Sequence, residues 1–355
     1  MNTSLPTACD DREVKPYYRH VHVPPPHSQT AWRVERHGPP EEVLELGEHP
    51  VAQAGPRHTV VKVAAAGVNF ADGLSCEGMY QDGVDPPFTP GIDVVGTVVD
   101  GEHPPGLGPS RRVVGTTLAP HGSWAHYALA RTTDLYPVSD AIDDATAVAA
   151  HVVFQTAWIA LHHRARIKPG DTVVVQAAAG STGSAAVQVA RAAGARVIAV
   201  AGGPDKVAAA VAAGASIGLD HRADDVVASV RHLTDGKGAD IAYDPVGAAT
   251  LDTSRRCLGF DGRLLVVGFA SGGTPPSLAA NHLLVRNLDA IGVAWPAYRS
   301  QRPDLVSTAQ THIDASLACG EFTPLVAGVR PLVEAAEALA DLRRGTTVGK
   351  WVLTT

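Results

Sequence analysis

The sequence predicts a two-domain α/β protein in which a doubly wound parallel sheet is joined to a smaller, β-rich barrel. Three observations favour this fold class. A strand–turn–helix pattern spans residues 173–190, six strand patterns alternate with helical ones after residue 157, and short strand patterns separated by Pro/Gly turns precede residue 155. The 355 residues, of which 45% are hydrophobic, suffice for two sizeable cores.

The strand–turn–helix pattern is the most informative segment. An apolar strand leads into the turn Ala-Ala-Ala-Gly-Ser-Thr-Gly at residues 177–183, and small residues recur along the helix that follows. Such a turn brings the pyrophosphate of a dinucleotide against backbone N–H groups at a helix N-terminus. Taken alone, the pattern A-x-x-G-x-x-G also fits an ordinary βα turn.

The second half of the chain supplies the context that this motif requires. A helix is expected at Ala157–Arg166, and Gly194, Gly214 and Pro204 mark helix ends and starts further along. After about Trp295 the sequence predicts a long helix, residues 332–343, and a closing strand, residues 349–353, packed on the first domain. The strands of the parallel sheet are expected at Thr172–Gln176, Arg196–Ala201, Ser216–Asp220, Asp240–Asp244, Arg263–Gly268 and Leu288–Val293.

The first half is irregular and β-rich. From Ala31 to about Gln155, strand patterns at Thr59–Val63, Val94–Val99 and Arg112–Gly115 are separated by Pro/Gly turns, which suits a compact barrel. Residues 1–30 contain three consecutive prolines and no apolar h-region. They are expected to form an extension, disordered or draped over the body, and not a secretory signal.

Composition narrows the function classes. A formal net charge of −7 without a block of like charges argues against a nucleic-acid partner. No run approaches the ~18 consecutive apolar residues of a membrane span. Cys9, Cys76, Cys257 and Cys319 are far apart, which indicates neither a zinc knuckle nor a disulfide framework and favours the reducing cytoplasm. Cys76 is either a reactive thiol or a small hydrophobic residue.

Ordered landmarks along the chain resemble one known family. From Ala31 to the C-terminus, the sequence is similar to the zinc-free NADPH:quinone oxidoreductase group of the medium-chain dehydrogenase/reductase superfamily. This resemblance implies a GroES-like domain from residues 31–155 and 296–355, and a Rossmann domain from residues 156–295. The landmarks are Ala66–Asp72 (AGVNFAD), Pro87–Gly91 (PFTPG), Gln155–Ala157 (QTA), the turn at 177–183, Asp244–Gly247 (DPVG), Val267–Ala270 (VGFA) and Gly349-Lys350.

Three departures from the family pattern stand out. Ala177 replaces the first glycine of the dinucleotide turn, and we interpret that position as needing mainly a small side chain. The family's Gly-Asp-Arg-Val appears as Ser-Arg-Arg-Val at residues 110–113, which weakens a structural contact more than the chemistry. Residues 1–30 have no counterpart.

A metal is not expected. Zinc-using relatives carry a Cys where this chain has Asn69, a Gly-His-Glu where it has Gly91-Ile92-Asp93, and a lobe of four Cys that is missing here. An amide and an isoleucine cannot replace a thiolate and an imidazole around tetrahedral zinc. Asp93 is expected to satisfy nearby backbone groups instead.

The cofactor is predicted to be NADPH. No carboxylate ends the second strand, where NAD-binding sites hold an acidic residue for the ribose 2′-OH. Gly202 and Gly203 leave room for a phosphate that Lys206 can reach, although Lys206 also suits a solvated first turn. Asp205 is the counter-argument, because a one-residue shift would place it on the ribose. By resemblance, His221 and Arg222 line the adenosine phosphate.

The resemblance implies the remaining cofactor contacts and places them in the cleft between the domains. They are Asn69, Gln155, Thr156, Ala179, Gly180, Ser181, Thr182, Gly183, Pro245, Val246, Gly268, Phe269, Ala270 and Lys350.

The reaction centre is predicted around Asn69. Its amide N–H is a neutral donor able to polarise a substrate oxygen, and the alternative is a loop amide that only fixes backbone. Asp72 is expected to hold this loop or to bond to Asn69 more than to perform acid–base chemistry. Tyr80 either donates to substrate or packs as a lid residue. The substrate pocket is assigned to Leu74, Trp124, Trp295 and Tyr298, for which ordinary interface packing is the alternative.

The predicted reaction is hydride transfer from NADPH to a small-molecule quinone or to the β-carbon of an α,β-unsaturated carbonyl. A stand-alone enoyl reductase of a biosynthetic pathway is the nearest variant. A protein that binds NADPH with a non-redox role, or with no catalytic role, is the alternative from another class. As in relatives, a homodimer is expected, joined through the edge strand Leu288–Val293.

Overall fold

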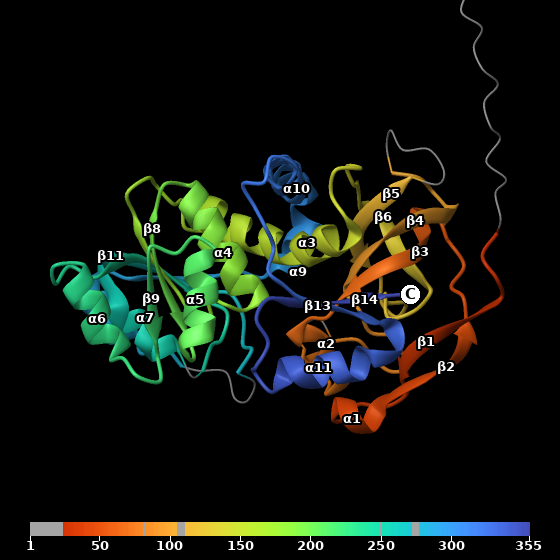
Figure 1. Cartoon of the computed structure of the whole chain (residues 1–355), viewed down its shortest axis with the longest axis horizontal. Coiled ribbons are helices and arrows are strands. Elements are labelled where there is room, and N and C mark those ends of the chain that lie inside the picture. Colours follow the sequence, from red (N-terminus) through yellow and green to blue (C-terminus); the bar gives the residue numbers. More distant parts are fainter. Residues whose placement is uncertain (1–23, 81–82, 105–110, 249, 272–276) are drawn as a thin grey trace, which may run out of the picture.

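The computed structural model describes residues 24–80, 83–104, 111–248, 250–271 and 277–355. Figure 1 shows a β-rich part and a parallel-sheet part side by side, with helix α3 lying between them. Helix α3 (Asp144–Trp158) runs without a break through the boundary expected between residues 155 and 156. The two parts therefore share a helix and are not joined by a flexible linker.

The β-rich part is built around a small barrel. Its strands β3 to β6 pair antiparallel in order, and β3 also pairs with β6, which closes the barrel. Strand β14 extends this sheet beside β3, and β13 adds to β14 in parallel. The bounds are β3 His58–Gly67, β4 Asp93–Gly101, β5 Arg112–Thr117, β6 Tyr127–Pro137, β13 Val326–Pro331 and β14 Lys350–Thr354.

Short helices and a hairpin cover the barrel. The hairpin, β1 (Ser28–Val34) with β2 (Leu44–Pro50), pairs antiparallel around α1 (Pro40–Val43), so the last residues of the expected extension belong to a strand. The helix expected at residues 332–343 divides into a 3-10 turn, η2, and an α-helix. The bounds are α2 Phe70–Cys76, η2 Leu332–Glu334 and α11 Ala335–Arg343.

The parallel sheet has the strand order β12-β11-β10-β7-β8-β9. The six strands predicted from the sequence are confirmed, and the largest difference is β11, which begins five residues before the expected start. The order reverses beside β7, and ligands of open α/β sheets bind at such a switch point. The strands are β7 Thr172–Val175, β8 Arg196–Ala201, β9 Ile217–Asp220, β10 Ala239–Asp244, β11 Leu258–Val266 and β12 Asp289–Gly292.

Helices cover both faces of this sheet. The two longest of the helices after β7 are α4, which follows the predicted turn, and α10, which belongs to the C-terminal segment. The helices are α4 Ser181–Ala192, α5 Pro204–Ala212, α6 Val226–Leu233, α7 Leu251–Cys257, α8 Ala280–Arg286, α9 Trp295–Gln301 and α10 Pro303–Ala318.

Helix α3 begins much earlier than the expected helix at residues 157–166. Asp143 caps its N-terminus by accepting from Thr146 N–H at 2.8 Å, and a π-helical stretch, η1 (Ile159–Arg164), continues it. Within the described chain, residues 144–164 form one helix long and apolar enough to cross a membrane. Because this helix is mostly buried inside the fold, it is the central core helix.

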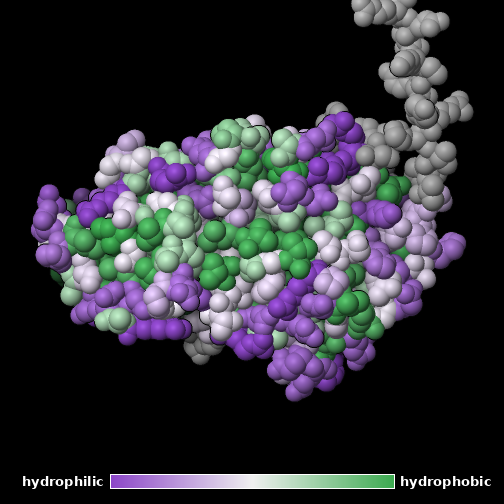
Figure 2. Space-filling view, viewed as in Figure 1, coloured by the Kyte–Doolittle hydropathy of each residue, from purple (hydrophilic) through white to green (hydrophobic). Residues whose placement is uncertain are grey.

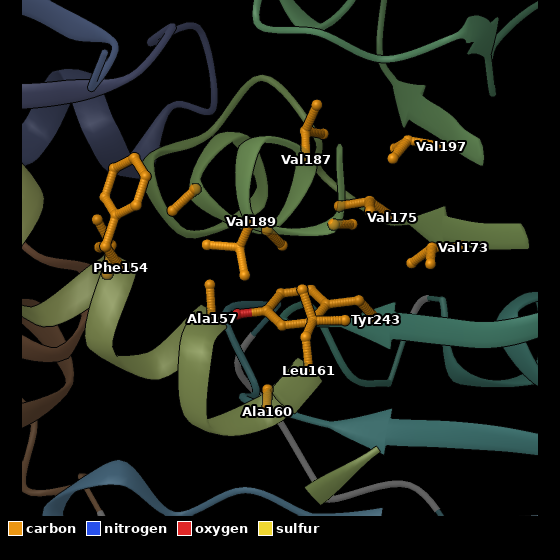
Figure 3. Close-up of a cluster of buried hydrophobic side chains, with 14 of the residues drawn as sticks. Phe154, Ala157, Ala160, Leu161, Val173, Val175, Val187, Val189, Val197 and Tyr243 are labelled. Carbon is orange, nitrogen blue, oxygen red and sulfur yellow. The ribbon is translucent and has the colours of Figure 1, made fainter. Parts of the chain in front are cut away.

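The main hydrophobic core lies between α3, α4 and the parallel sheet. Figure 3 shows Phe154 and Ala157 of α3 facing Val189 of α4, with Tyr243 of β10 below. Helix α10 adds Ala309 and Ile313 to the same core. The C-terminal segment, expected to pack on the first domain, therefore also completes the core of the second.

The surface in Figure 2 shows hydrophobic residues gathered in a band that crosses the middle of this face, with hydrophilic residues above and below it. Part of the band overlies α5, whose nine residues include charged side chains only in the first turn, Asp205 and Lys206. The charged first turn of α5 therefore lies close to the carboxyl end of β8, and the rest of the helix carries no charge.

A buried polar network connects α3 to α10. The Gln155 amide donates to Gln310 Oε1 at 2.6 Å, and Gln310 donates to Asp314 at 2.7 Å. The ring of His151 lies 3.0 Å from Gln310 Oε1 through Nδ1 and 3.2 Å from Thr116 Oγ1 through Nε2. Because Gln310 Oε1 can only accept, Nδ1 carries the proton and Nε2 accepts from Thr116.

Burial lowers the pKa of His151 from 6.5 to about 4, so the imidazole is neutral in the folded protein. The charged groups that act on it are Asp93, Lys350 and Arg299. Between these two pKa values the unfolded chain binds a proton that the native chain refuses. Stability from this group is therefore present above pH 6.5 and is lost as the pH falls toward 4.

We expect His151→Asn to flatten this pH dependence, because the amide still donates to Gln310 without titrating. Between about pH 7.5 and about pH 5, the native protein should lose about 2 kcal/mol more unfolding free energy than the variant. Urea denaturation at both pH values measures the difference. Equal losses in the two proteins would show that His151 is not buried as a neutral group.

Candidate active-site cleft

The dinucleotide-type turn lies at the carboxyl end of the central strand β7. Gly180 precedes the first turn of α4, and a Cβ at Gly183 would lie 2.2 Å from the carbonyl oxygen of Ala177. Only glycine fits at residue 183. Ala177 adopts φ 47°, in the left-handed region that favours glycine. The position of Ala177 thus needs a particular backbone conformation, and the sequence interpretation of a mere size requirement was incomplete.

A cavity of about 390 Å³, here called the inter-domain cavity, opens at this turn. One wall comes from the parallel-sheet part and the other from α2 and the segment after it. The cavity brings together fourteen of the residues predicted for the cofactor, the reaction and the substrate. They are Asn69, Leu74, Tyr80, Thr156, Gly180, Ser181, Thr182, Gly183, Pro245, Val246, Gly268, Phe269, Ala270 and Trp295.

Asp244 shapes the sheet-side wall. It is fully buried at the end of β10 and accepts from the N–H groups of Val246 and Gly247, both at 2.9 Å. The hydroxyls of Thr250 and Ser254 donate to the same carboxylate. Four hydrogen-bond donors therefore satisfy one buried carboxylate and fix the loop that lines the cavity.

Asn69 faces the cavity from the barrel side, immediately before α2. Its Nδ2 donates to Asp93 Oδ2 at 2.8 Å, and Asp93 forms a buried ion pair with Lys350. An ionised carboxylate only accepts, so the amide nitrogen must face Asp93. This bond uses one of the two amide hydrogens. Asp93 was expected to satisfy backbone groups, whereas its Oδ2 binds two side chains.

Asp72 holds the Asn69 loop. Its carboxylate accepts from the N–H of Asn69 at 2.7 Å and from the N–H of Gly91 at 3.1 Å, while its own N–H donates to the Asn69 carbonyl. Burial, opposed by these bonds, raises the pKa of Asp72 to about 7. The geometry is that of a structural brace between α2 and the segment before β4.

Five predicted site residues lie elsewhere. Trp124 is completely buried in the barrel core, where its indole N–H donates to the Gly67 carbonyl at 3.2 Å. Lys350 is fully buried against Asp93 and does not line the cavity. Tyr298 packs edge-on against His163. Gln155 lies in the α3–α10 network and accepts from Trp295 Nε1 at 2.9 Å. Ala179 is buried, and its carbonyl accepts from the N–H of Gly349.

These differences have one physical cause. A sequence motif marks residues that the fold needs near a site. It does not distinguish a residue that contacts the ligand from a buried residue that holds the contacting residue in place. Gln155 and Lys350 lie behind the wall. Gln155 accepts from Trp295, which lines the cavity, and Lys350 binds Asp93, which in turn holds Asn69.

A basic cluster occupies the tips of β8 and β9. A Cβ at Gly202 would lie 2.8 Å from His221 Nε2 and 3.2 Å from Arg222 Nε, which places both side chains over the glycine pair. Lys206 donates to the Gly345 carbonyl, and burial together with nearby Arg222 lowers the pKa of Lys206. The Asp220 carboxylate accepts from the N–H groups of Gly203 and Arg222. The cluster thus holds the predicted phosphate residues together.

Burial decides whether Cys76 is a reactive thiol or a small hydrophobic residue. Its side chain is completely buried with Val34, Val43 and Phe88. Burial raises the pKa of the thiol to about 12, so Cys76 is a hydrophobic packing residue and not a nucleophile.

Sequence reasoning named Asp244 only as a family landmark and gave it no role, and it missed both side-chain partners of Asp93. It also missed a larger cavity of about 600 Å³, here called the barrel cavity, which adjoins the inter-domain cavity through Tyr80, Ile92 and Trp295. A buried aspartate directly after an apolar strand, as at Asp244, was the available signal. No group of three or more His, Cys, Asp or Glu that could hold a metal occurs among the described residues.

Comparisons with known proteins agree with this architecture. Residues 55–140 match the family model described as alcohol dehydrogenase GroES-like domain, and residues 181–311 match the one described as zinc-binding dehydrogenase. A quinone oxidoreductase-like protein 2 from Rattus norvegicus is 33% identical over 316 residues, covering 88% of this chain and 89% of that protein.

Two further relatives bear on the site. The structure of Escherichia coli quinone oxidoreductase complexed with NADPH superposes with a TM-score of 0.85 at 26% identity, covering 92% of this chain and all of that one. A phthioceranic/hydroxyphthioceranic acid synthase from Mycobacterium bovis is 30% identical over 335 residues, which span 92% of this chain but 15% of the synthase.

The fold and cleft are those of two-domain, dinucleotide-type oxidoreductases. The chain belongs to the medium-chain dehydrogenase/reductase family, in its quinone oxidoreductase group.

Proposed function

We propose that this chain binds NADPH and transfers its hydride to a quinone or to the C=C bond of an α,β-unsaturated carbonyl. The observation that carries the proposal is the inter-domain cavity, where the dinucleotide-type turn and the Asn69 amide face one space. The complex of the Escherichia coli relative with NADPH supports the cofactor, and the names of the relatives support the acceptor class.

The residues of the chain divide the work. The turn at residues 180–183 offers backbone N–H groups at the start of α4 to a pyrophosphate. Bound NADPH would supply the hydride from its nicotinamide ring. Asn69 can donate its second amide hydrogen to the acceptor oxygen, because its first is held by Asp93. Phe269 and Trp295 give the cavity apolar walls that exclude water.

The barrel side offers one group for protonating the product. Tyr80 lines both cavities and carries a phenol able to donate. Asp72, although its pKa is near neutrality, is bound by two backbone N–H groups and serves as a brace. Proton delivery by Tyr80 or by solvent thus fits the site better than delivery by Asp72.

A stand-alone enoyl reductase is the variant that a specific observation favours. Nearly the whole chain matches a segment of the phthioceranic/hydroxyphthioceranic acid synthase. The same cavity would then hold an enoyl group with its carbonyl on Asn69. A non-redox role for bound NADPH remains the alternative from another class, and consumption of the cofactor separates the two.

Zinc independence is part of the proposal. Asn69 and Ile92 replace soft donors that zinc prefers, and the carboxylate of Asp93 is already paired with Lys350. A bound cation there would compete with the Lys350 ammonium.

We expect NADPH consumption with a panel of quinones and conjugated enones, followed as loss of nicotinamide absorbance. Preincubation with a chelator should leave the rate unchanged. A rate abolished by chelation and restored by zinc would refute metal independence, and tight NADPH binding without consumption would favour the non-redox role.

The basic cluster should select NADPH over NADH. Lys206→Ala and Arg222→Ala are each expected to raise the KM for NADPH about tenfold, the size of one charge-assisted contact to a phosphate, with the KM for NADH unchanged. Lys237→Ala is the control, since Lys237 lies before β10 at the opposite end of the sheet. Unchanged selectivity in both variants would move the 2′-phosphate site away from this cluster.

A homodimer through the β12 edge is also proposed. Strand β12 pairs only with β11 among the described strands, and it is largely exposed. Nearby α8 presents Leu284 and Val285, each 77% exposed. We expect light scattering to give twice the chain mass of 36.8 kDa, and Leu284→Glu with Val285→Glu to shift it toward the monomer. A monomeric native protein would contradict the proposal.

A further inference from the structure

The barrel cavity adjoins the space in which the acceptor would react. It lies among α2, the segment before β4, the end of β5 with the loop that follows it, Arg131 of β6 and helix α9. Tyr80, Ile92 and Trp295 form part of its wall and part of the wall of the inter-domain cavity. An acceptor whose reactive end lies at Asn69 therefore has about 600 Å³ beside it for the rest of the molecule.

Most of this second space is apolar. Val84, Phe88, Leu118, Pro296 and Ala297 line it, and three of its hydroxyl groups, those of Ser75, Thr117 and Ser300, donate to backbone carbonyls. For example, Thr117 donates to the Gly91 carbonyl at 2.7 Å. Such walls suit an alkyl or aromatic extension of the acceptor.

Among the described residues, one aspartate and two arginines line the barrel cavity. Its only described acidic residue is Asp72, whose oxygens accept backbone N–H groups. Arg299 lies over the Trp295 ring at 5.3 Å and is already paired with Asp134. Arg131, in contrast, is exposed on β6 and has no ion pair or side-chain hydrogen bond with any described residue.

We propose that the acceptor of this enzyme is amphiphilic, with an apolar chain that fills the barrel cavity and an anionic end group bound by Arg131. The inference rests on the proposed function, since it places the reactive carbonyl at Asn69. A guanidinium without an acidic partner recognises carboxylate or phosphate oxygens in the same bidentate way. Arg299 is not assigned this role, because its guanidinium is already paired with Asp134.

The test compares matched acceptors. The probes are enones whose alkyl chains, of increasing length, end in a carboxylate, and the methyl esters of the same molecules. At the chain length that reaches Arg131, kcat/KM should be about fivefold higher for the carboxylate than for its ester, the size expected for a partly exposed ion pair. Added salt should reduce this preference.

Arg131→Gln should abolish the preference by lowering kcat/KM for the carboxylates while leaving the esters unchanged. Lys62→Gln is the matched control, because it removes an exposed cation from the neighbouring strand β3 that does not line the cavity. Calorimetric titration with the saturated ketones of both series gives the same comparison without turnover.

The outcomes separate the two levels of the proposal. Esters and carboxylates reduced equally well at every chain length would overturn the anionic acceptor while leaving the reductase intact. A preference that survives in Arg131→Gln would also overturn it. Tighter calorimetric binding of the carboxylates without any NADPH consumption would support the anion site and refute the proposed reaction.

Discussion

The buried contact of Asp93 with Lys350 and Asn69 is the interaction on which the site depends. Asp93 opens β4, Lys350 opens β14 and Asn69 precedes α2, so a single carboxylate joins three separate segments. Both members of the ion pair are fully buried, and removing one partner of such a pair typically costs about 3–5 kcal/mol. The pair is therefore weak as a source of net stability but strong as a constraint on where Asn69 lies.

The start of β14 also connects the buried Asp93–Lys350 pair to the dinucleotide-type turn. Gly349, the neighbour of Lys350, donates to the Ala179 carbonyl at 2.8 Å and forms a parallel bridge with Gly180. The barrel side and the sheet side of the cleft thus meet through two adjacent residues at the start of β14. Pre-organisation of this kind is what hydride transfer requires, since the reacting atoms must be held close and shielded from water.

Most of the fold followed from periodicity, because the parallel strands are apolar runs punctuated by glycine and proline, and all six lie where the sequence predicts them. Helix α3 was largely missed because it is apolar on all sides, so it shows no amphipathic pattern that would mark its start. At the site, the turn and its loop were predictable. Lys350, Gln155 and Trp124 do not line the inter-domain cavity, and a motif does not reveal whether a residue contacts a ligand or supports one that does. The φ of Ala177 and the pairing of Asp93 depend on long-range contacts that no local pattern encodes.

The most direct measurement follows the fate of deuterium placed on one face or the other of the nicotinamide C4 of NADPH. In a single turnover with an enone or quinone, mass spectrometry of the NADP⁺ product reports which hydrogen has left. Because the proposed binding mode turns one face of the ring toward Asn69, we expect one labelled cofactor to lose all its deuterium and the other to keep it. Loss of label from both, or no conversion to NADP⁺, would contradict hydride transfer in this cleft.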